Sequence, residues 1–320
     1  MKLAVFSPVF GNKTLEEALR YLSSKGVDGM ELGAGGYPGK AHADILELKK
    51  DAGKRAALKD LFAKYNMEIC ALSVHGNRVH PQAAVARTAT EELEAALCVA
   101  EKMGIKKVVT FSGCPGDGKG DMPNWVTCPW PNEFSDVLRY QWEDVLVPYW
   151  KEHAKQAEDA GVQICFEMHP GFCVYNPETM LKLRGAAGKA LGANLDPSHL
   201  IWQGIDVAEA IRTLGDALYY FHAKDTAVDR RNAAVNGVLD TKPYADEIHR
   251  SWIFRTVGYG SGEKYWKDVC TALRLVGYDY YMSIEHEDSL MTQEEGLDKA
   301  IDFMKSVMIK QPKMKDMWWV

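Results

Sequence analysis

Short apolar runs alternate with longer amphipathic stretches along the whole chain of 320 residues. The short runs have the length of buried β-strands, whereas the longer stretches repeat apolar residues every three or four positions, as helices do. Several of the amphipathic stretches end at a glycine, such as Gly26, Gly104 or Gly161, where a helix stop is expected. Regular alternation of this kind predicts parallel strands joined by helical crossovers.

The pattern contains eight strand–helix units. We predict strands at residues 3–7, 27–32, 68–75, 107–112, 163–167, 192–196, 218–222 and 280–285. We predict helices at residues 15–25, 45–65, 90–103, 145–160, 177–183, 207–214, 265–276 and 293–308. Eight such units close into a (β/α)8 barrel, the TIM-barrel fold. An open doubly wound sheet is the alternative, but no glycine-rich phosphate loop follows any of the strands. We therefore expect one domain, residues 1–320, with a tail at 309–320.

Two connections are longer than the usual few residues. Residues 113–132 follow the fourth strand and carry Trp125, and residues 225–262 follow the seventh strand and carry Arg255. Both are predicted to be loops at the C-terminal rim of the barrel, where enzymes of this fold form their sites. Trp125 and Arg255 are therefore candidate substrate contacts, with packing or a subunit contact as the alternative.

Charge and cysteine content narrow the class of protein. The net charge is −6, and no cluster of lysines and arginines forms the basic face of a nucleic-acid-binding protein. Seven cysteines occur without a regular framework, which fits a reducing compartment. No apolar run has the length of a membrane span or a signal segment. We expect a cytoplasmic protein that binds neither nucleic acid nor a membrane.

Four of the predicted strands in the second half end on a carboxylate or an imidazole: Glu167, Asp196, His222 and Glu285. Any one of these residues alone could cap a helix or form a surface ion pair. Strands five to eight are neighbours in a closed barrel, so the four side chains are expected to meet at one point. Three crowded carboxylates require positive charge, and this donor set suits a divalent cation.

Further polar residues lie at or just after strand ends. His199 follows Asp196 by three positions and is expected to touch a substrate oxygen, or else to bond a backbone carbonyl. His75 ends the third strand and could reach the pocket. Lys224 could serve a substrate hydroxyl or carbonyl, or pair with Asp225.

Glu31, at the end of the second strand, is expected to be a hydrogen-bond partner rather than a catalyst. His169 and His286 follow strands that carry candidate ligands, and their roles stay open.

A cation beside two carboxylates suits one kind of chemistry. Removing a proton next to a carbonyl leaves negative charge on oxygen, which a bound cation stabilises. One carboxylate can act as the base and a second can return the proton. Isomerisation, epimerisation and elimination can all use such a site.

With these motifs, the chain resembles the sugar isomerase/epimerase group of xylose isomerase-like barrels. The resemblance rests on the segments that end in Glu167, Asp196–His199, His222–Asp225 and Glu285, and on residues 258–263 before the last strand. It implies that Glu167, Asp196, His222 and Glu285 hold Mn²⁺ or Mg²⁺, with Zn²⁺, Co²⁺ or Fe²⁺ as possible alternatives. It also implies that Glu167 and Glu285 form the acid/base pair and that His199 binds a substrate oxygen.

One position departs from the epimerase pattern. The epimerases carry an arginine a few residues beyond the histidine of the seventh strand, where this chain has Val228. Arg230, Arg231 or Arg255 could take its place.

The leading hypothesis is a metal-dependent isomerase or epimerase of a keto-sugar or related polyol. A lyase or dehydratase acting on a 3-keto-glycoside or inosose is the alternative. Phosphodiester hydrolysis is less favoured, because a nuclease of this fold needs a histidine where the chain has Phe111 and Ser112. A non-catalytic subunit is a further possibility, since the tail Met317–Val320 carries two tryptophans suited to docking on the barrel or another subunit. We expect a homo-oligomer or a partner subunit.

Overall fold

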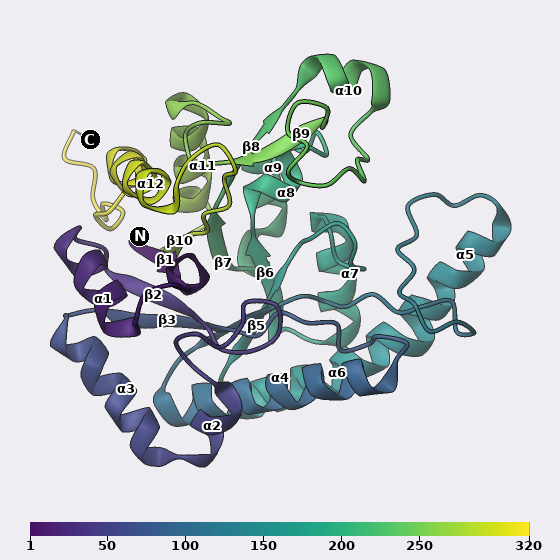
Figure 1. Ribbon diagram of the computed structural model, residues 1–320, viewed down its shortest axis with the longest axis horizontal. Coiled ribbons are helices and arrows are strands. Elements are labelled where there is room, and N and C mark those ends of the chain that lie inside the picture. Colours follow the sequence, from purple (N-terminus) through teal and green to yellow (C-terminus); the bar gives the residue numbers. More distant parts are fainter. Residues whose placement is uncertain (320) are drawn as a thin grey trace.

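The computed structural model describes residues 1–319, and its centre is a closed barrel of eight parallel strands (Figure 1). Around the barrel the strands follow the order β1-β10-β7-β6-β5-β4-β3-β2. Their bounds are β1 Lys2–Phe6, β2 Gly29–Gly33, β3 Glu68–Ser73, β4 Lys107–Thr110, β5 Gln163–Glu167, β6 Leu191–Leu195, β7 Leu218–Ala223 and β10 Tyr281–Ile284. The predicted (β/α)8 fold is confirmed.

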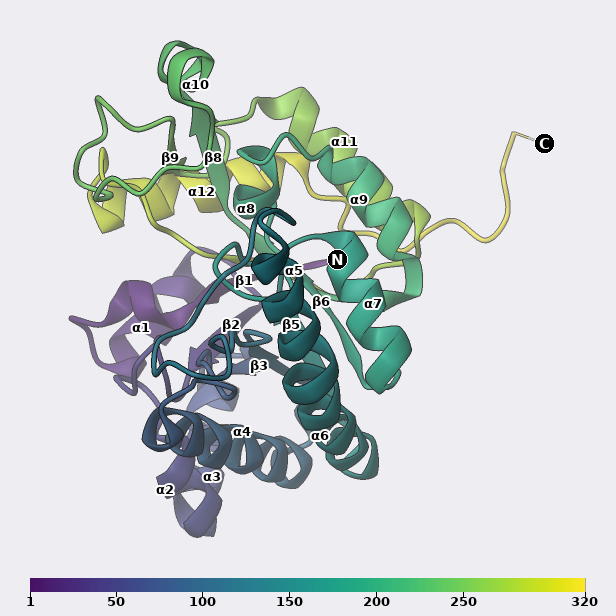
Figure 2. The same cartoon turned by 90° about the vertical axis from the view of Figure 1, so that its right-hand side faces the viewer.

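Helices surround the barrel and connect its strands (Figure 2). The main ones are α1 Leu15–Ser24, α2 Ile45–Lys50, α3 Ala52–Lys64, α4 Ala83–Met103, α6 Val147–Asp159, α7 Pro177–Ala187, α9 Val207–Leu214, α11 Glu263–Leu275 and α12 Gln293–Val307. Shorter pieces are α5 Asn132–Arg139, α8 Pro197–Ile201, the 3-10 turns η1 Ser7–Phe10 and η3 Gly215–Ala217, and the π-helical η2 Tyr140–Leu146. Side-chain caps mark the starts of several of these helices, as at Thr14, which forms a capping box with Glu17.

Three predicted helices differ from the structure. The single helix predicted at residues 45–65 is two helices, because Asp51 is extended (φ −112°, ψ 108°) and accepts a hydrogen bond from the Lys54 N–H as a new N-cap. Helix α4 begins at Ala83, before the predicted start. The helix predicted from residue 145 is the end of a longer rod, in which α5, η2 and α6 follow one another (Figure 2).

The segment 225–262, predicted as a loop, contains regular structure instead. Strands β8 Asp225–Val228 and β9 Trp252–Arg255 pair antiparallel, and helix α10 Arg230–Asn236 lies between them at the top of Figure 1. The side chain of Asp225 anchors this segment. Its Oδ2 accepts hydrogen bonds from the N–H groups of Gly258, Gly260 and Ser261 and from Nε1 of Trp266. A buried carboxylate contacting distant positions is not visible in local sequence spacing.

Within the described residues, the other long connection has no helix or strand before α5 begins at Asn132, and the tail has none. In the connection at 113–132, Trp125 packs edge-on against Tyr175, with ring centroids 5.5 Å apart. The tail beyond α12 extends away from the barrel in Figure 2, and its Trp318 and Trp319 are 82% and 62% exposed. Val320 lies outside the described residues. Docking of the tail on the barrel or on another subunit stays a prediction.

Apolar side chains fill the barrel below the C-terminal ends of its strands, and a site can form above them at those ends. The barrel interior is filled by buried side chains that form one compact cluster: Ala4, Cys70, Ala71, Val109, Cys165, Tyr220 and Tyr281. A larger cluster lies between the strands and the surrounding helices. Within residues 1–319, none of the helices combines the length and apolarity needed to cross a membrane.

Candidate metal centre and active site

Four adjacent strands bring the predicted metal ligands together at the C-terminal end of the barrel. Glu167 ends β5, Asp196 follows β6, His222 lies in β7 and Glu285 follows β10. One donor atom from each residue lies within 4.8 Å of the donor atoms of the other three. Asp196 and His222 are fully buried, so the polar atoms of the group have little access to water. The strand order alone accounts for this convergence, because β10, β7, β6 and β5 are consecutive neighbours.

The unpaired atoms of this group fit a divalent cation. Asp196 Oδ2, His222 Nδ1 and Glu285 Oε2 are buried and have no hydrogen-bond partner. His222 Nδ1 lies 2.8 Å from Glu285 Oε2, but the two atoms lack hydrogen-bonding geometry. Buried polar atoms are nearly always paired, so three neighbouring ligand atoms without a hydrogen bond are suited to share one cation. A cation bound by one imidazole and three carboxylates satisfies all of them.

The ionisation of the carboxylates gives the same indication. Burial raises the pKa of Asp196 to about 6, with Glu285 and Glu167 adding repulsion against the opposite effect of His199 and Lys224. Burial opposes ionisation of Glu285 as well, yet Lys224 and His222 lower its pKa to about 2. The cationic side chains of the protein therefore compensate the charge of Glu285 more fully than that of Asp196. A divalent ion would allow Asp196 to ionise together with its neighbours.

Glu31 orients the imidazole of His222. It is fully buried, and its carboxylate is hydrogen-bonded to His222 Nε2 (3.0 Å) and to the hydroxyl of Ser73. A proton on Nε2 leaves the lone pair on Nδ1, which faces the other candidate ligands. Metal-binding histidines are commonly held in this way by a carboxylate. Glu31 is thus the hydrogen-bond partner that its position at a strand end suggested.

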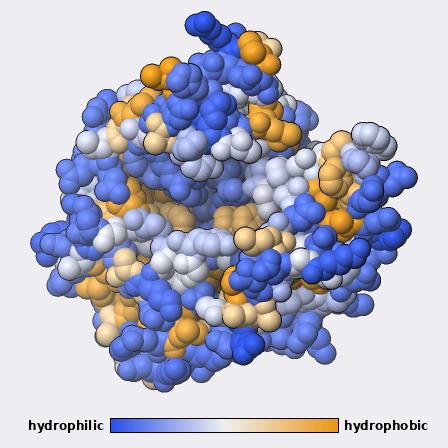
Figure 3. Space-filling model, turned by 45° about the vertical axis from the view of Figure 1, so that its right-hand side comes forward, coloured by the Kyte–Doolittle hydropathy of each residue, from blue (hydrophilic) through white to orange (hydrophobic). Residues whose placement is uncertain are grey.

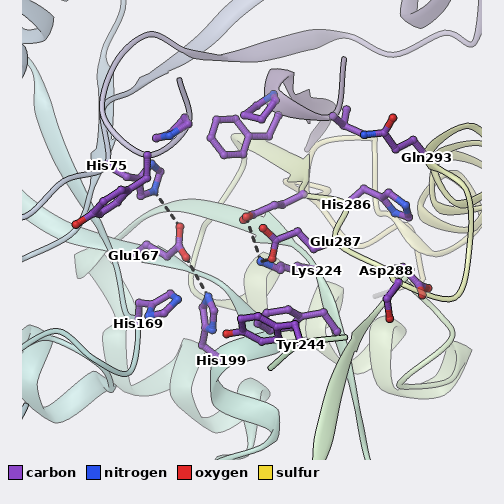
Figure 4. Close-up of a pocket in the computed structure, with 18 of the residues that line it drawn as sticks. His75, Glu167, His169, His199, Lys224, Tyr244, His286, Glu287, Asp288 and Gln293 are labelled. Carbon is purple, nitrogen blue, oxygen red and sulfur yellow. Dashed lines mark hydrogen bonds and ion pairs between the residues drawn. The ribbon is translucent and has the colours of Figure 1, made fainter. Parts of the chain in front are cut away.

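Two histidines hold Glu167 from opposite sides (Figure 4). His75 Nε2 lies 3.0 Å from Glu167 Oε2, and His199 Nε2 lies 3.0 Å from Glu167 Oε1. His199 Nε2 is also 3.3 Å from Asp196 Oδ2, so this nitrogen faces carboxylates rather than a backbone carbonyl. Burial raises the pKa of Glu167, but the contacts of His199, His222 and His75 outweigh it and hold that pKa well below its usual range.

Lys224 contacts Glu285 and not Asp225. Its Nζ lies 3.1 Å from Glu285 Oε1 and 2.6 Å from Glu287 Oε2, and it stands over the ring of Phe254. The alternative pairing with Asp225 is wrong, because that carboxylate binds backbone N–H groups. Burial disfavours the charged amine, but the neighbouring carboxylates keep the pKa of Lys224 well above its usual value.

A cavity of about 690 Å³ opens above these residues. This volume lies within the roughly 300–1,000 Å³ of ligand pockets. Figure 3 shows the face of the molecule hollowed below the protruding α10 segment. The cavity is lined by Phe6, Pro8, Val9, Tyr37, Pro38, His75, Phe111, Glu167, His169, His199, Lys224, Tyr244, Ile253, Phe254, Glu285, His286, Glu287, Asp288, Ser289 and Gln293.

The described lining includes two of the four predicted substrate contacts, His75 and Lys224, and not Trp125 or Arg255. Arg255 instead pairs through Nε with Asp288 Oδ2 at 3.1 Å, beside the cavity. Arg230 and Arg231, the other arginines considered, are exposed on α10.

Sequence reasoning missed the aromatic and polar residues of the upper cavity, notably Tyr37, Tyr244 and Phe254, because long connections deliver them without a local pattern. Gly36 allows the first of these loops to lie against His75. Its φ is +64°, and a Cβ there would stand 1.8 Å from the His75 carbonyl oxygen. That carbonyl accepts the Tyr37 N–H at 2.9 Å.

The chain belongs to the family described as xylose isomerase-like TIM barrels, whose model matches residues 19–307. The predicted family resemblance is confirmed. The uncharacterized protein YfiH of Bacillus subtilis (strain 168) is 37% identical over 312 residues, covering 96% of this chain and 99% of that protein.

Two solved structures show the same fold at low sequence identity. The IOLI protein, solved with a bound zinc atom, is 20% identical with a TM-score of 0.67, over 98% of this chain and 100% of its own. The 3-keto-D-glucoside 4-epimerase YcjR from E. coli is 13% identical with a TM-score of 0.64, over 96% of this chain and 99% of its own.

Proposed function

We propose that this protein is a divalent-metal-dependent enzyme that abstracts a proton next to the carbonyl of a keto-sugar or related polyol, as an isomerase or epimerase. The observation that carries the proposal is the pair Glu167 and Glu285 at one candidate cation site on the wall of a cavity. The pair has different partners: histidines hold Glu167, and Lys224 holds Glu285. Both carboxylates have pKa values below their usual range, so both are ionised and available as a base.

The cation and the residues around it have separate roles in this reaction. When bound, the divalent cation polarises the substrate carbonyl and stabilises the negative charge that develops on its oxygen. Glu285, kept ionised by Lys224, accepts the proton from carbon. Glu285 can return this proton to a neighbouring carbon, which gives isomerisation. For return on the opposite face, Glu167 first takes a proton from His75 or His199, which contact its two oxygens, and then passes it to carbon. His199 also offers a contact to a substrate oxygen.

The upper cavity suits a sugar rather than a nucleic acid. Tyr37, Tyr244 and Phe254 present aromatic surface, and Tyr244 stacks on Phe254 with ring centroids 5.6 Å apart. His75 and Lys224 supply polar contacts near the candidate cation. The proteins with similar structures include an epimerase of a keto-glucoside and a barrel that binds zinc, which supports both a sugar substrate and a metal.

Elimination from the same carbanion is the alternative reaction. Elimination needs an acid that protonates the leaving group, and the cavity contains one candidate for this role. His286 lines the cavity directly after Glu285, and both of its ring nitrogens are buried without a hydrogen-bond partner. Burial lowers the pKa of His286, so its imidazole is neutral and would donate a ring N–H to a departing oxygen in a lyase or dehydratase acting on a 3-keto-glycoside or inosose.

The reaction is tested by incubating the protein with ketoses, inososes and 3-keto-glycosides in deuterated water, with Mn²⁺ or Mg²⁺ present. Deuterium in a recovered isomer or epimer supports the proposal and locates the acidic carbon. Loss of an oxygen substituent identifies elimination. If no compound in the panel exchanges or reacts, the proposed function is contradicted.

Glu285→Gln tests the base. We expect turnover to fall by about 10²–10⁴-fold, because the amide cannot accept a proton, while the fold persists. Deuterium exchange and circular dichroism measure the two effects. Glu294→Gln, an exposed glutamate at the start of α12, is the matched control and should behave as the wild type. Near-normal turnover of Glu285→Gln with metal still bound would remove Glu285 from this role.

A further inference from the structure

Two cysteines from neighbouring loops meet at the C-terminal end of the barrel. Cys114 lies in the connection after β4 and Cys173 in the connection after β5, and these two strands pair with each other in the barrel. The side chains of the two cysteines are hydrogen-bonded to each other. Both are buried, with exposed fractions of 1% and 5%. Neither belongs to the candidate metal centre.

Backbone hydrogen bonds hold the two loops together at this point. The N–H of Cys173 donates to the carbonyl of Gly113 at 3.0 Å, so Cys173 lies across from the residue just before Cys114. The side chain of Asn77 holds Cys114 in turn, because it accepts the Cys114 N–H at 3.0 Å and donates to the Cys114 carbonyl at 2.8 Å. The main-chain positions of both residues are therefore fixed, and the fold itself keeps the two thiols close.

The contact gives the two sulfurs different character. The hydrogen bond from the Cys173 thiol lowers the pKa of Cys114, although burial opposes this effect. The same contact, together with burial, raises the pKa of Cys173. Cys114 is therefore the more readily ionised of the two, with a thiol beside it. The thiolate is the form of cysteine that reacts with oxidants, and a second thiol next to it can complete a disulfide.

We propose that Cys114 and Cys173 form a redox modification site, which hydrogen peroxide converts to a disulfide. The sulfur of Cys114 attacks one oxygen of the peroxide and breaks the O–O bond, which leaves a sulfenic acid and, after protonation, water. The sulfur of Cys173 gives up its proton and attacks the sulfenic sulfur, which forms the S–S bond and releases a second water. Two thiols are oxidised and one peroxide is reduced. Burial favours this small oxidant over a bulky one, and the inference does not depend on the proposed reaction.

The disulfide would lie behind one wall of the cavity. Phe111 lines the cavity and comes shortly before Cys114 in the chain. Phe172, next to Cys173, stacks on Phe111 with ring centroids 4.3 Å apart. Oxidation therefore ties together the two segments that carry this stack. It also closes the chain between the two cysteines, which contains α5, η2, α6 and β5, into one loop. Cross-linking a loop of this length stabilises the folded chain.

Mass spectrometry of the full-length wild type tests the site. The reduced protein is treated with hydrogen peroxide, denatured in an alkylating agent and digested without reductant. The dose is raised until Cys128, which is exposed, is oxidised. We expect a peptide pair linked through Cys114 and Cys173, with the loss of two hydrogen atoms, that dithiothreitol separates. Oxidised Cys128 together with alkylated Cys114 and Cys173 would overturn the proposal.

Two variants test the separate roles of the sulfurs. In Cys173→Ser we expect the sulfenic acid of Cys114 to persist and to react with dimedone, whereas in Cys114→Ser the remaining Cys173 should stay reduced at the same dose. Equal dimedone labelling of the two variants would contradict the assignment of Cys114 as the reacting thiolate. Cys128→Ser is the matched control and should form the disulfide as the wild type does.

Calorimetry shows whether the disulfide constrains the fold. We expect the oxidised wild type to melt at a higher temperature than the reduced wild type, and the same peroxide treatment to produce no increase in Cys173→Ser. Equal melting temperatures of the oxidised and reduced wild type would show that the bond does not tie the two segments together.

Discussion

At the scale of single residues, the candidate metal centre depends on side chains that hold the ligands as much as on the ligands. Glu31 binds the outer nitrogen of His222, and Lys224 binds the outer oxygen of Glu285. Each contact leaves the inner atom of the ligand, His222 Nδ1 or Glu285 Oε2, without a hydrogen-bond partner. The inner atoms are therefore available to a cation, and the outer partners determine how they point.

Replacing Glu31 by Gln tests this support. We expect metal affinity to fall by about 10–100-fold, the usual effect of losing such an outer partner, because the amide is a weaker acceptor for the N–H of His222. Competition with a coloured chelator measures the affinity. Glu17→Gln, at an exposed helix cap, should leave it unchanged. Equal affinities for Glu31→Gln and the wild type would show that the contact does not act on the metal.

At the scale of elements, the segment between β7 and α11 forms one wall of the cavity. The pair β8–β9 contributes Ile253 and Phe254, and the stretch between the strands contributes Tyr244. The segment begins directly after Lys224, so its anchoring also affects the lysine beside Glu285. The fully buried Asp225 provides this anchor through four N–H donors.

Replacing Asp225 by Ala removes that anchor. Each buried donor left unsatisfied costs about 1–3 kcal/mol, so we expect a loss of roughly 3 kcal/mol or more in the free energy of unfolding. Urea denaturation measures this loss. We expect Asp225→Asn, which keeps one acceptor oxygen, to lose less. A change below ~0.5 kcal/mol for Asp225→Ala, the range of ordinary surface substitutions, would contradict the assigned role.

At the scale of the whole molecule, the barrel gathers buried charge that its own cations balance only in part. Glu167, Asp196 and Glu285 meet at one end of a closed sheet, with Lys224 as the neighbouring amine. A cation that binds the folded chain and not the unfolded one stabilises the fold through mass action. The metal therefore connects the site to the stability of the entire barrel.

Removal of metal should lower the melting temperature. At a metal concentration 100 times the dissociation constant, bound metal contributes about 2.7 kcal/mol. For a chain of this size we expect a decrease of roughly 5 °C after treatment with a chelator. Scanning calorimetry with and without Mn²⁺ measures this decrease. In the variant Asp196→Asn, the melting temperatures with and without Mn²⁺ should differ much less than in the wild type. Identical melting curves would indicate that the folded chain does not bind the ion.

The sequence by itself determined the barrel and the residues that end its strands. Hydrophobic periodicity is local, so it identifies strands and helices, and closure of eight units places the ends of neighbouring strands together. Glu167, Asp196, His222 and Glu285 could be named together for this reason. The continuous helix predicted across Asp51 was wrong, because an N-cap is a weak signal within an amphipathic stretch.

The tertiary structure alone decided how those residues are held and what surrounds them. The contact of His222 with Glu31 joins positions 191 residues apart. Lys224 pairs with Glu285 rather than with Asp225, because a distant loop supplies the N–H groups that Asp225 binds. Side-chain partners of this kind follow from the register and closure of the sheet, which local spacing does not encode. The contact between Cys114 and Cys173 became visible for the same reason.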